Sequence, residues 1–275
     1  MVPVSSIAFM IFSMFVGVLL PVGTIIYLKR KYDLGLKPFF IGCMIIMVAS
    51  TVPSLLNAYF INGSPLSTLL DKYAVFNALF YGITIAIFEE GGKFLAMRFM
   101  LADKYDDDHN ALMYGAGHGG FEAFWVLVFG NIPYLTAALR INSEGIDSLV
   151  SLVNEASRDE VREGFNMLVE TPSYTFLYGP LEKIAMVAMH IALSVIVWYA
   201  ATRAKKLKYL WIAMFLHLFS SASVDLVNKW AETTISNGVL QTIIVEIYMY
   251  GITALCVYMA VRVWRQNVAE KVLED

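Results

Sequence analysis

The hydrophobic positions of this sequence form long stretches that few charged residues interrupt, and they do not alternate with polar positions. A helix needs about 20 apolar residues to cross a bilayer. Seven stretches satisfy this length, at residues 4–28, 38–61, 73–100, 110–139, 173–202, 209–228 and 238–262. The pattern predicts an all-α polytopic membrane bundle with seven transmembrane helices, folded as a single transmembrane domain over residues 1–275.

The composition agrees with a membrane protein. The chain of 275 residues is 58% hydrophobic and 16% charged, whereas soluble domains are about 45–50% apolar and about 25% charged. So much apolar surface cannot be buried in one core of this size, which excludes a soluble globular protein. A net charge of −3, without a basic run that contains interleaved aromatic residues, excludes nucleic-acid binding. Cys43 and Cys256 both lie in apolar stretches, so any metal must be held by histidines and carboxylates.

The distribution of basic residues predicts the orientation of the chain. If the N-terminus is outside, thirteen lysines and arginines lie in inner loops and the C-terminal tail, and five lie in outer loops. An excess of Lys and Arg in short loops marks the cytoplasmic side, so we expect the N-terminus outside and the C-terminus in the cytoplasm. The first stretch is followed, not preceded, by basic residues, which is unlike a cleavable signal. The expected location is a cell membrane, as a multi-pass protein of a bacterial cytoplasmic membrane.

One long connection, residues 140–172, is acidic and extracytoplasmic in this orientation. Its apolar residues recur at helical spacing on both sides of a capping box formed by Ser157 and Glu160. We therefore expect two short amphipathic helices that lie over the outer face of the bundle. The simpler interpretation is a surface hairpin that has no role beyond packing.

Ionisable residues within membrane spans are costly, and each one is therefore a functional hypothesis. This sequence has an unusually full set of them: Glu89, Glu90 and Lys93 in the third span, His118 and Glu122 in the fourth, Glu182, Lys183 and His190 in the fifth, His217 and Asp225 in the sixth, and Glu246 in the seventh.

Depth in the membrane decides which of these residues can meet. At 1.5 Å per residue from the predicted inner ends, the glutamate pair lies at roughly 12–14 Å, His118 at roughly 14 Å, His217 at roughly 12 Å and His190 at roughly 17 Å. Four helices therefore bring polar groups to one level. Asp225 and Glu246 lie at roughly 24 Å, where they either pair with each other or form a separate polar layer.

Imidazoles and carboxylates are the usual ligands of a catalytic zinc ion, which keeps one position for water while a spare carboxylate takes the water's proton. We predict Glu89, Glu90 and His118 as catalytic residues, with Lys93 and Glu122 in support. The predicted ligands of Zn²⁺ are His118, Glu122, His190 and His217. The alternative for each histidine is hydrogen-bonded packing. For His118, the sequence Gly-Ala-Gly-His-Gly-Gly can also mark only a close helix crossing.

The motif from Glu89 to Lys93, then Tyr114-x-x-x-His118 with Glu122, and a later histidine in each of two further spans resembles the YhfC family. That family belongs to the superfamily of CAAX prenyl proteases, bacteriocin-processing enzymes and PrsW-type intramembrane proteases. The resemblance covers residues 73–228. It implies that Glu89 and Glu90 are the catalytic pair, with Glu89 activating water, and that His118, His190 and His217 complete the site.

This chain departs from the superfamily pattern in three ways. Lys93 is one position nearer to the glutamates than the arginine of the prenyl proteases, and Tyr114 replaces a phenylalanine. In the superfamily, Asn or Asp stands four residues after each later histidine, whereas this chain has Ser194 after His190 and Ser221 after His217. The resemblance therefore does not imply prenylated substrates.

These observations favour an intramembrane metalloprotease that depends on glutamate and histidine and cleaves a membrane protein, a peptide or a lipid-modified peptide from the cytoplasmic half of the bilayer. One alternative is a zinc-dependent lipid amide hydrolase. Another is a non-enzymatic scaffold or transport protein. Haem bound by two histidines is a minor alternative.

Overall fold

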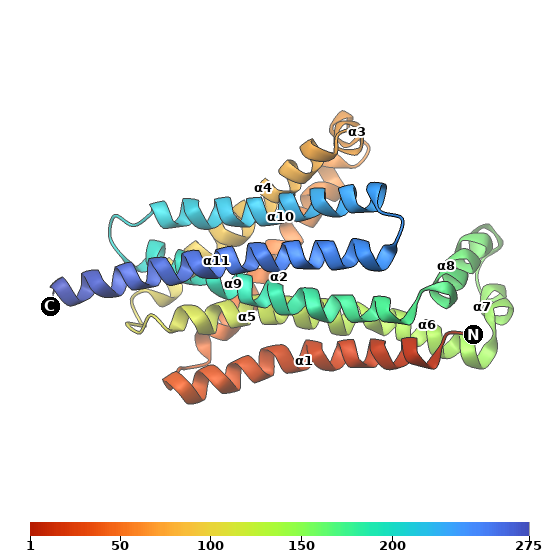
Figure 1. The fold of residues 1–275 in the computed structure, drawn as a ribbon, viewed down its shortest axis with the longest axis horizontal. Helices are drawn as coiled ribbons and strands as arrows, with labels where there is room; N and C mark the ends of the chain where they lie inside the picture. The colour runs from red at the N-terminus through yellow and green to blue at the C-terminus, as the bar shows by residue number, and fades with distance from the viewer. Residues whose placement is uncertain (275) are drawn as a thin grey trace. The chain divides into compact units, whose positions relative to one another are not determined.

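A computed structural model describes residues 1–274, and these residues are helical almost throughout, with no β-strand among them. The elements in chain order are α1 (Val4–Tyr32), α2 (Lys37–Leu56), η1 (Asn57–Ile61), α3 (Pro65–Lys72), α4 (Ala74–Ala96), η2 (Met97–Leu101), α5 (Asn110–Phe124), η3 (Trp125–Phe129), α6 (Asn131–Glu144), α7 (Ile146–Ser151), η4 (Glu155–Ser157), α8 (Arg158–Glu170), η5 (Ser173–Leu177), α9 (Tyr178–Thr202), α10 (Lys208–Thr234) and α11 (Gly238–Glu274). Figure 1 shows their course. The predicted all-α fold is confirmed.

All seven predicted spans are confirmed as helices long and apolar enough to cross a membrane. They are Val4–Tyr32, Lys37–Leu56, Ala74–Leu101, Asn110–Glu144, Ser173–Thr202, Lys208–Thr234 and Gly238–Ala269. Several helices continue past the predicted ends, because charged residues end an apolar stretch without ending a helix. α1 includes Lys29, Arg30 and Lys31 in its last turn. The chain is a multi-pass membrane protein, and its predicted orientation stays a prediction.

The chain divides into two compact units, and the predicted single domain stays a prediction. The first unit comprises Met1–Val22 and Ala123–Ile184, and the second comprises Gly23–Glu122 and Ala185–Asp275. Each unit is described by itself.

The first unit contains the two helices predicted between residues 140 and 172. Leu149 of α7 and Leu168 of α8 are buried together with Val2, Ala138 and Ile141, so the apolar faces of both helices pack against α6 and the start of the chain. The predicted capping box is wrong, because a 3₁₀ turn directly before α8 gives the N-cap residue Ser157 a nearly helical backbone and its hydroxyl does not cap. An N-cap normally needs an extended backbone. Asn154 caps this turn instead, by accepting a hydrogen bond from the Ser157 backbone N–H at 3.0 Å.

The N-terminus is fastened beside this pair of helices. The Val2 backbone N–H donates to Asn142 Oδ1 at 2.7 Å, and Asn142 Nδ2 donates back to the Val2 carbonyl at 2.9 Å. The N-terminus therefore lies at the same end of the unit as residues 140–172, as the predicted orientation requires. Whether this end is extracytoplasmic stays a prediction.

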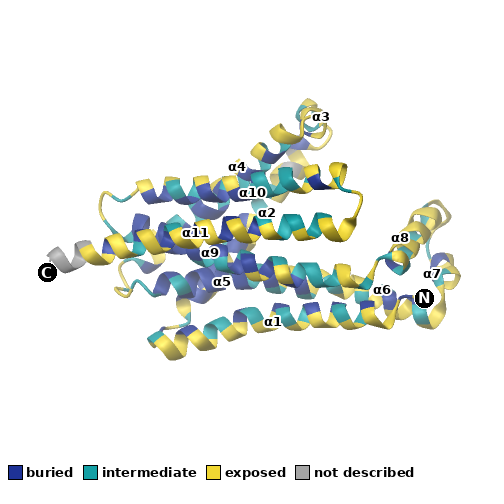
Figure 2. Ribbon diagram, viewed as in Figure 1, coloured by how far each residue is buried: buried dark blue, intermediate teal, exposed yellow. Residues whose placement is uncertain are grey.

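The second unit is built around α9, the most enclosed of the seven spans. In the most apolar window of Ser173–Thr202, 78% of the residues are buried, whereas the other spans reach 17–33%. Figure 2 shows this difference as dark blue along α9. α4 packs closely along α10, where Gly82 lies against Leu218, and α10 also contacts α11. In this unit His190 and Ser194 of α9 are buried and therefore shielded from lipid.

Candidate functional site

Glycines of α5 bring three helices unusually close together around His118. A Cβ atom on Gly117 would lie 2.0 Å from the Phe39 carbonyl oxygen of α2. On the α9 side, a Cβ on Gly115 would lie 2.6 Å from Ile191 Cα. No side chain fits at these two positions, so the predicted close helix crossing is present. Because the crossing involves helices on both sides of α5, it also holds His118 in a fixed place between them.

The third span contributes two acids and a base to the same place. Glu89, Glu90 and Lys93 of α4 are all buried, Glu90 and Lys93 completely. Lys93 Nζ donates to Glu90 Oε1 at 2.6 Å, one helical turn away. Burying charges in an apolar interior is tolerable only when they are paired, and this ion pair meets that requirement.

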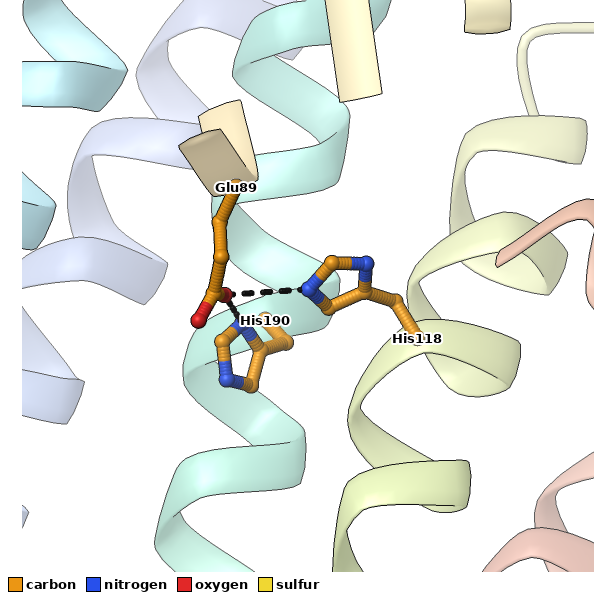
Figure 3. Close-up of side chains that lie close together, drawn as sticks. All are labelled: Glu89, His118 and His190. Carbon is orange, nitrogen blue, oxygen red and sulfur yellow. Dashed lines mark hydrogen bonds and ion pairs between the residues drawn. The ribbon is translucent and has the colours of Figure 1, made fainter. Parts of the chain in front are cut away.

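Glu89 meets two histidines from different helices, as Figure 3 shows. Its Oε2 atom lies 3.1 Å from His118 Nε2 and 3.8 Å from His190 Nδ1. Both imidazoles are buried, with His118 fully enclosed. The two rings are close neighbours, with centroids 4.9 Å apart. One carboxylate oxygen and two imidazole nitrogens thus converge on one point inside the protein.

Glu90 meets the third histidine. His217 Nδ1 of α10 lies 2.7 Å from Glu90 Oε1, the same oxygen that accepts the hydrogen bond from Lys93. With the Lys93 ammonium beside this carboxylate, the Nδ1–H of His217 is the donor in the pair. Two donors therefore hold Oε1, while Glu90 Oε2 is buried and has no hydrogen-bond partner.

The orientation of the His190 ring follows from its neighbours. An ammonium group can only donate, so the 3.3 Å contact from Lys93 Nζ makes His190 Nδ1 an acceptor. The ring proton is then on Nε2, which lies 2.9 Å from Glu122 Oε2. Glu122 thus contacts the nitrogen opposite the one that faces Glu89. A carboxylate in this position can orient a metal-binding histidine, and a small turn of either side chain would form the hydrogen bond that the 2.9 Å contact lacks.

Five polar atoms in this region are buried without a hydrogen-bond partner among the described residues: Glu90 Oε2, Tyr114 Oη, His118 Nδ1, His190 Nε2 and Ser194 Oγ. An unpaired buried polar atom costs about 1–3 kcal/mol, so a group of them is expected where water, an ion or a ligand completes the site. Tyr114 and Ser194 were not predicted as site residues. The available signal was their spacing, four residues before His118 and four after His190.

The donor set fits a divalent metal ion. Two groups bring their ligand atoms within 4.8 Å of one another: Glu89 with His118 and His190, and Glu89 with Glu90 and His217. Ligands at about 2.0–2.1 Å from a tetrahedral zinc ion lie about 3.3 Å apart, and the distances of 3.1 and 3.8 Å around Glu89 Oε2 bracket this value. In the second group, Glu90 Oε1 is held by both Lys93 and His217, at 2.6 and 2.7 Å, whereas in the first group Lys93 makes only a 3.3 Å contact with His190 Nδ1, so the first group is the better site.

The predicted ligands are therefore divided between different parts of the cluster. His118 and His190 lie in one metal-binding group and His217 in the other, while Glu122 lies in neither. The predicted catalytic residues Glu89, Glu90 and His118 are all in contact with the cluster. Their roles stay predictions.

Asp225, Glu182 and Lys183 have partners away from the cluster. Asp225 Oδ2 accepts from Lys229 Nζ at 2.7 Å, and that ammonium also donates to Asn77 at 3.4 Å. In the first unit, Lys183 Nζ lies 3.2 Å from Glu182 Oε1. Asp225 thus belongs to a second polar layer that is braced by a lysine one helical turn away.

Seven membrane-length helices with buried glutamates and histidines define a multi-pass membrane protein that has a candidate metal centre in its core. A family model described as YhfC intramembrane metalloprotease matches residues 16–249, and the chain belongs to this family. It is 32% identical over 271 residues to the Uncharacterized membrane protein YhfC of Bacillus subtilis (strain 168), an alignment that covers 96% of this chain and 99% of that protein. No solved structure matches the chain.

Proposed function

We propose that this protein is a zinc-dependent intramembrane peptidase in which Glu89, His118 and His190 hold the ion and Glu90 is the general base. The observation that carries the proposal is the buried triangle of one carboxylate and two imidazoles beside a second carboxylate with an unpaired oxygen. Two histidines and one glutamate are a known ligand set of catalytic zinc in peptidases. The description of the family supports the same activity.

When bound, zinc supplies a Lewis acid that makes a water more acidic and polarises the scissile carbonyl. Glu90 Oε2 is the acceptor for the proton of the attacking water, because its other oxygen is held by Lys93 and His217. The water oxygen adds to the carbonyl carbon, the C–N bond breaks, and Glu90 returns its proton to the leaving amine.

The remaining residues position this machinery. Lys93 and His217 both donate to Glu90 Oε1, which favours the ionised carboxylate that a general base needs. Glu122 Oε2 lies 2.9 Å from His190 Nε2, and in the proposal it is the acceptor for the proton on that nitrogen, which leaves Nδ1 for the ion. Lys93 Nζ already donates to Glu90 Oε1 at 2.6 Å, so it would keep that partner if His190 Nδ1, at 3.3 Å, held the ion instead.

The experiment compares membranes from cells that lack the endogenous gene and express either the native chain or Glu90→Gln, and it profiles all protein N-termini by mass spectrometry. We expect new N-termini at membrane-associated sites with the native chain and their loss with Glu90→Gln. Asp225→Asn, which removes a carboxylate from the separate polar layer, is the matched control and should leave cleavage intact.

Equal N-termini in the native and Glu90→Gln membranes would contradict the peptidase. If free fatty acids rather than peptides depended on Glu90, the activity would be that of a lipid amide hydrolase. If neither product changed, a scaffold or transport protein would be favoured.

A further inference from the structure

A cavity of about 350 Å³ lies in the second unit on the other side of α9 from the glutamate and histidine cluster. This volume is within the range of about 300–1,000 Å³ that is usual for small-molecule sites. At about 100° per residue, the lining residues Ala188, Ile191, Ala192 and Val195 point roughly 100–160° away from His190. The body of α9 therefore separates this cavity from the candidate metal centre.

Small side chains produce the hollow. Ala188 and Ala192 of α9 and Ala260 of α11 line it, with Leu112 and Val261 forming part of the remaining wall. The hollow is partly open at its wall, where Val261 is exposed, and its apolar groups offer water no hydrogen-bond partners. In a membrane protein the matching occupant is a hydrocarbon chain. The volume is too small for another helix, whose diameter with side chains is about 10–12 Å.

One end of the cavity is lined by aromatic and basic residues, which are Tyr32, His109, Trp264 and Arg265. These residues lie at the C-terminal end of α1, directly before α5, and in the last part of α11, all on the predicted cytoplasmic side. Aromatic residues with a cation at one level are typical of the membrane interface. The cavity thus has a polar mouth and an apolar interior.

The charge of the mouth favours an anion. Asp107 Oδ1 accepts a hydrogen bond from the His109 backbone N–H at 2.9 Å and lies 2.6 Å from His109 Nδ1, so this carboxylate is already occupied within its own loop. Arg265 is exposed and adds positive charge, and Lys31 Nζ lies 5.1 Å from the ring of Tyr32. A cation close to an anionic membrane surface is worth about 1 kcal/mol.

We propose that this cavity binds one acyl chain of an anionic phospholipid, with the lipid phosphate at Arg265. The apolar interior takes the chain, and the aromatic and cationic mouth takes the headgroup. The bound chain packs against the back of the helix that carries His190. The proposal rests on the cavity alone and is independent of the proposed peptidase activity.

The test titrates the purified full chain in a mild detergent with palmitoyl-oleoyl phosphatidylglycerol or with phosphatidylcholine that has the same chains, and counts lipid adducts by native mass spectrometry. We expect the first phosphatidylglycerol adduct at about fivefold lower concentration, which corresponds to the cation contribution of about 1 kcal/mol. Arg265→Gln should remove this difference. Arg262→Gln, whose guanidinium lies over the Tyr258 ring and outside the cavity, should keep it.

The chain pocket is tested by filling it. Ala188→Phe should weaken the first adduct of both lipids at least tenfold, and Ala254→Phe, at an exposed position of α11 outside the cavity, should not. Val261→Trp, on the exposed part of the wall, is the second filling variant if Ala188→Phe does not fold. Glycerol 1-phosphate, which has the headgroup chemistry without chains, should not bind in the same range.

Four results would overturn the proposal. They are equal binding of the two lipids by the native chain, the same effect of Arg265→Gln and Arg262→Gln, undiminished binding by a folded filling variant, and binding of glycerol 1-phosphate as tightly as the lipid. The last result would assign the mouth to a free phosphate.

Discussion

Replacing Gly117 by alanine tests how closely α5 must approach α2 to place His118. The added Cβ would lie 2.0 Å from the Phe39 carbonyl oxygen and 2.7 Å from the carbonyl carbon, whereas ordinary contact begins at 3.4 Å. Both neighbours are backbone atoms, so no side chain can turn aside, and the helices must separate by about 1.4 Å. Overpacking of this kind costs about 1–3 kcal/mol, and we expect the upper end of that range.

The assay is equilibrium unfolding of the purified chain in mixed detergent micelles, followed by circular dichroism. Gly251→Ala is the matched control, because Gly251 lies in the interior of α11 and a Cβ added there would have nothing within 4 Å. In the control, the better helix propensity of alanine should leave stability unchanged or raise it by up to about 1 kcal/mol. If the free energy of unfolding of Gly117→Ala were within about 0.5 kcal/mol of that of the native chain, the close crossing of α5 and α2 would be contradicted.

Three further predictions concern the cluster and its surroundings. Glu122→Gln should lower zinc affinity by about 10–100-fold in a competition titration with a chelating dye, because the far side of His190 loses its carboxylate; unchanged affinity would exclude the orienting role. Asp108→Asn should destabilise the chain by about 1.5–3 kcal/mol in the same unfolding assay, because the carboxylate accepts from Arg203 at 2.9 and 3.0 Å. The exposed Asp106→Asn is its control, and an equal effect of both would refute the reasoning. Free zinc at 100 times its Kd should stabilise the native chain by about 2.7 kcal/mol and a chelator should reverse this, whereas a melting temperature that zinc does not move would count against a folded binding site.

The sequence was sufficient to predict the helices that span the membrane, because apolar length alone determines which segments cross a bilayer. It was less informative about where helices begin and end. The hydroxyl of Ser157 matches a capping pattern, yet the preceding 3₁₀ turn removes the extended backbone that capping needs. The short helix α3 between the second and third spans was not predicted, because its pattern has no membrane-length apolar run.

Counting depth along each helix was sufficient to group the glutamates and histidines, since a straight helix rises by a fixed amount per residue. Depth says nothing about which ring nitrogen faces which carboxylate. That choice depends on side-chain contacts between helices, such as Lys93 with His190 Nδ1 and Glu122 with His190 Nε2. The predicted ligand role of Glu122 and the catalytic role of Glu89 are the assignments that this detail affects most.

The measurement that tests the central claim most directly is elemental analysis of the purified chain and two variants, each checked for folding. We predict about one zinc ion per native chain, loss of zinc in His118→Ala and retention in Glu90→Gln, because Glu90 is the proposed base and not a ligand. A native chain that binds no metal when zinc is supplied, or a His118→Ala chain that keeps its full zinc content, would contradict the proposed metal centre.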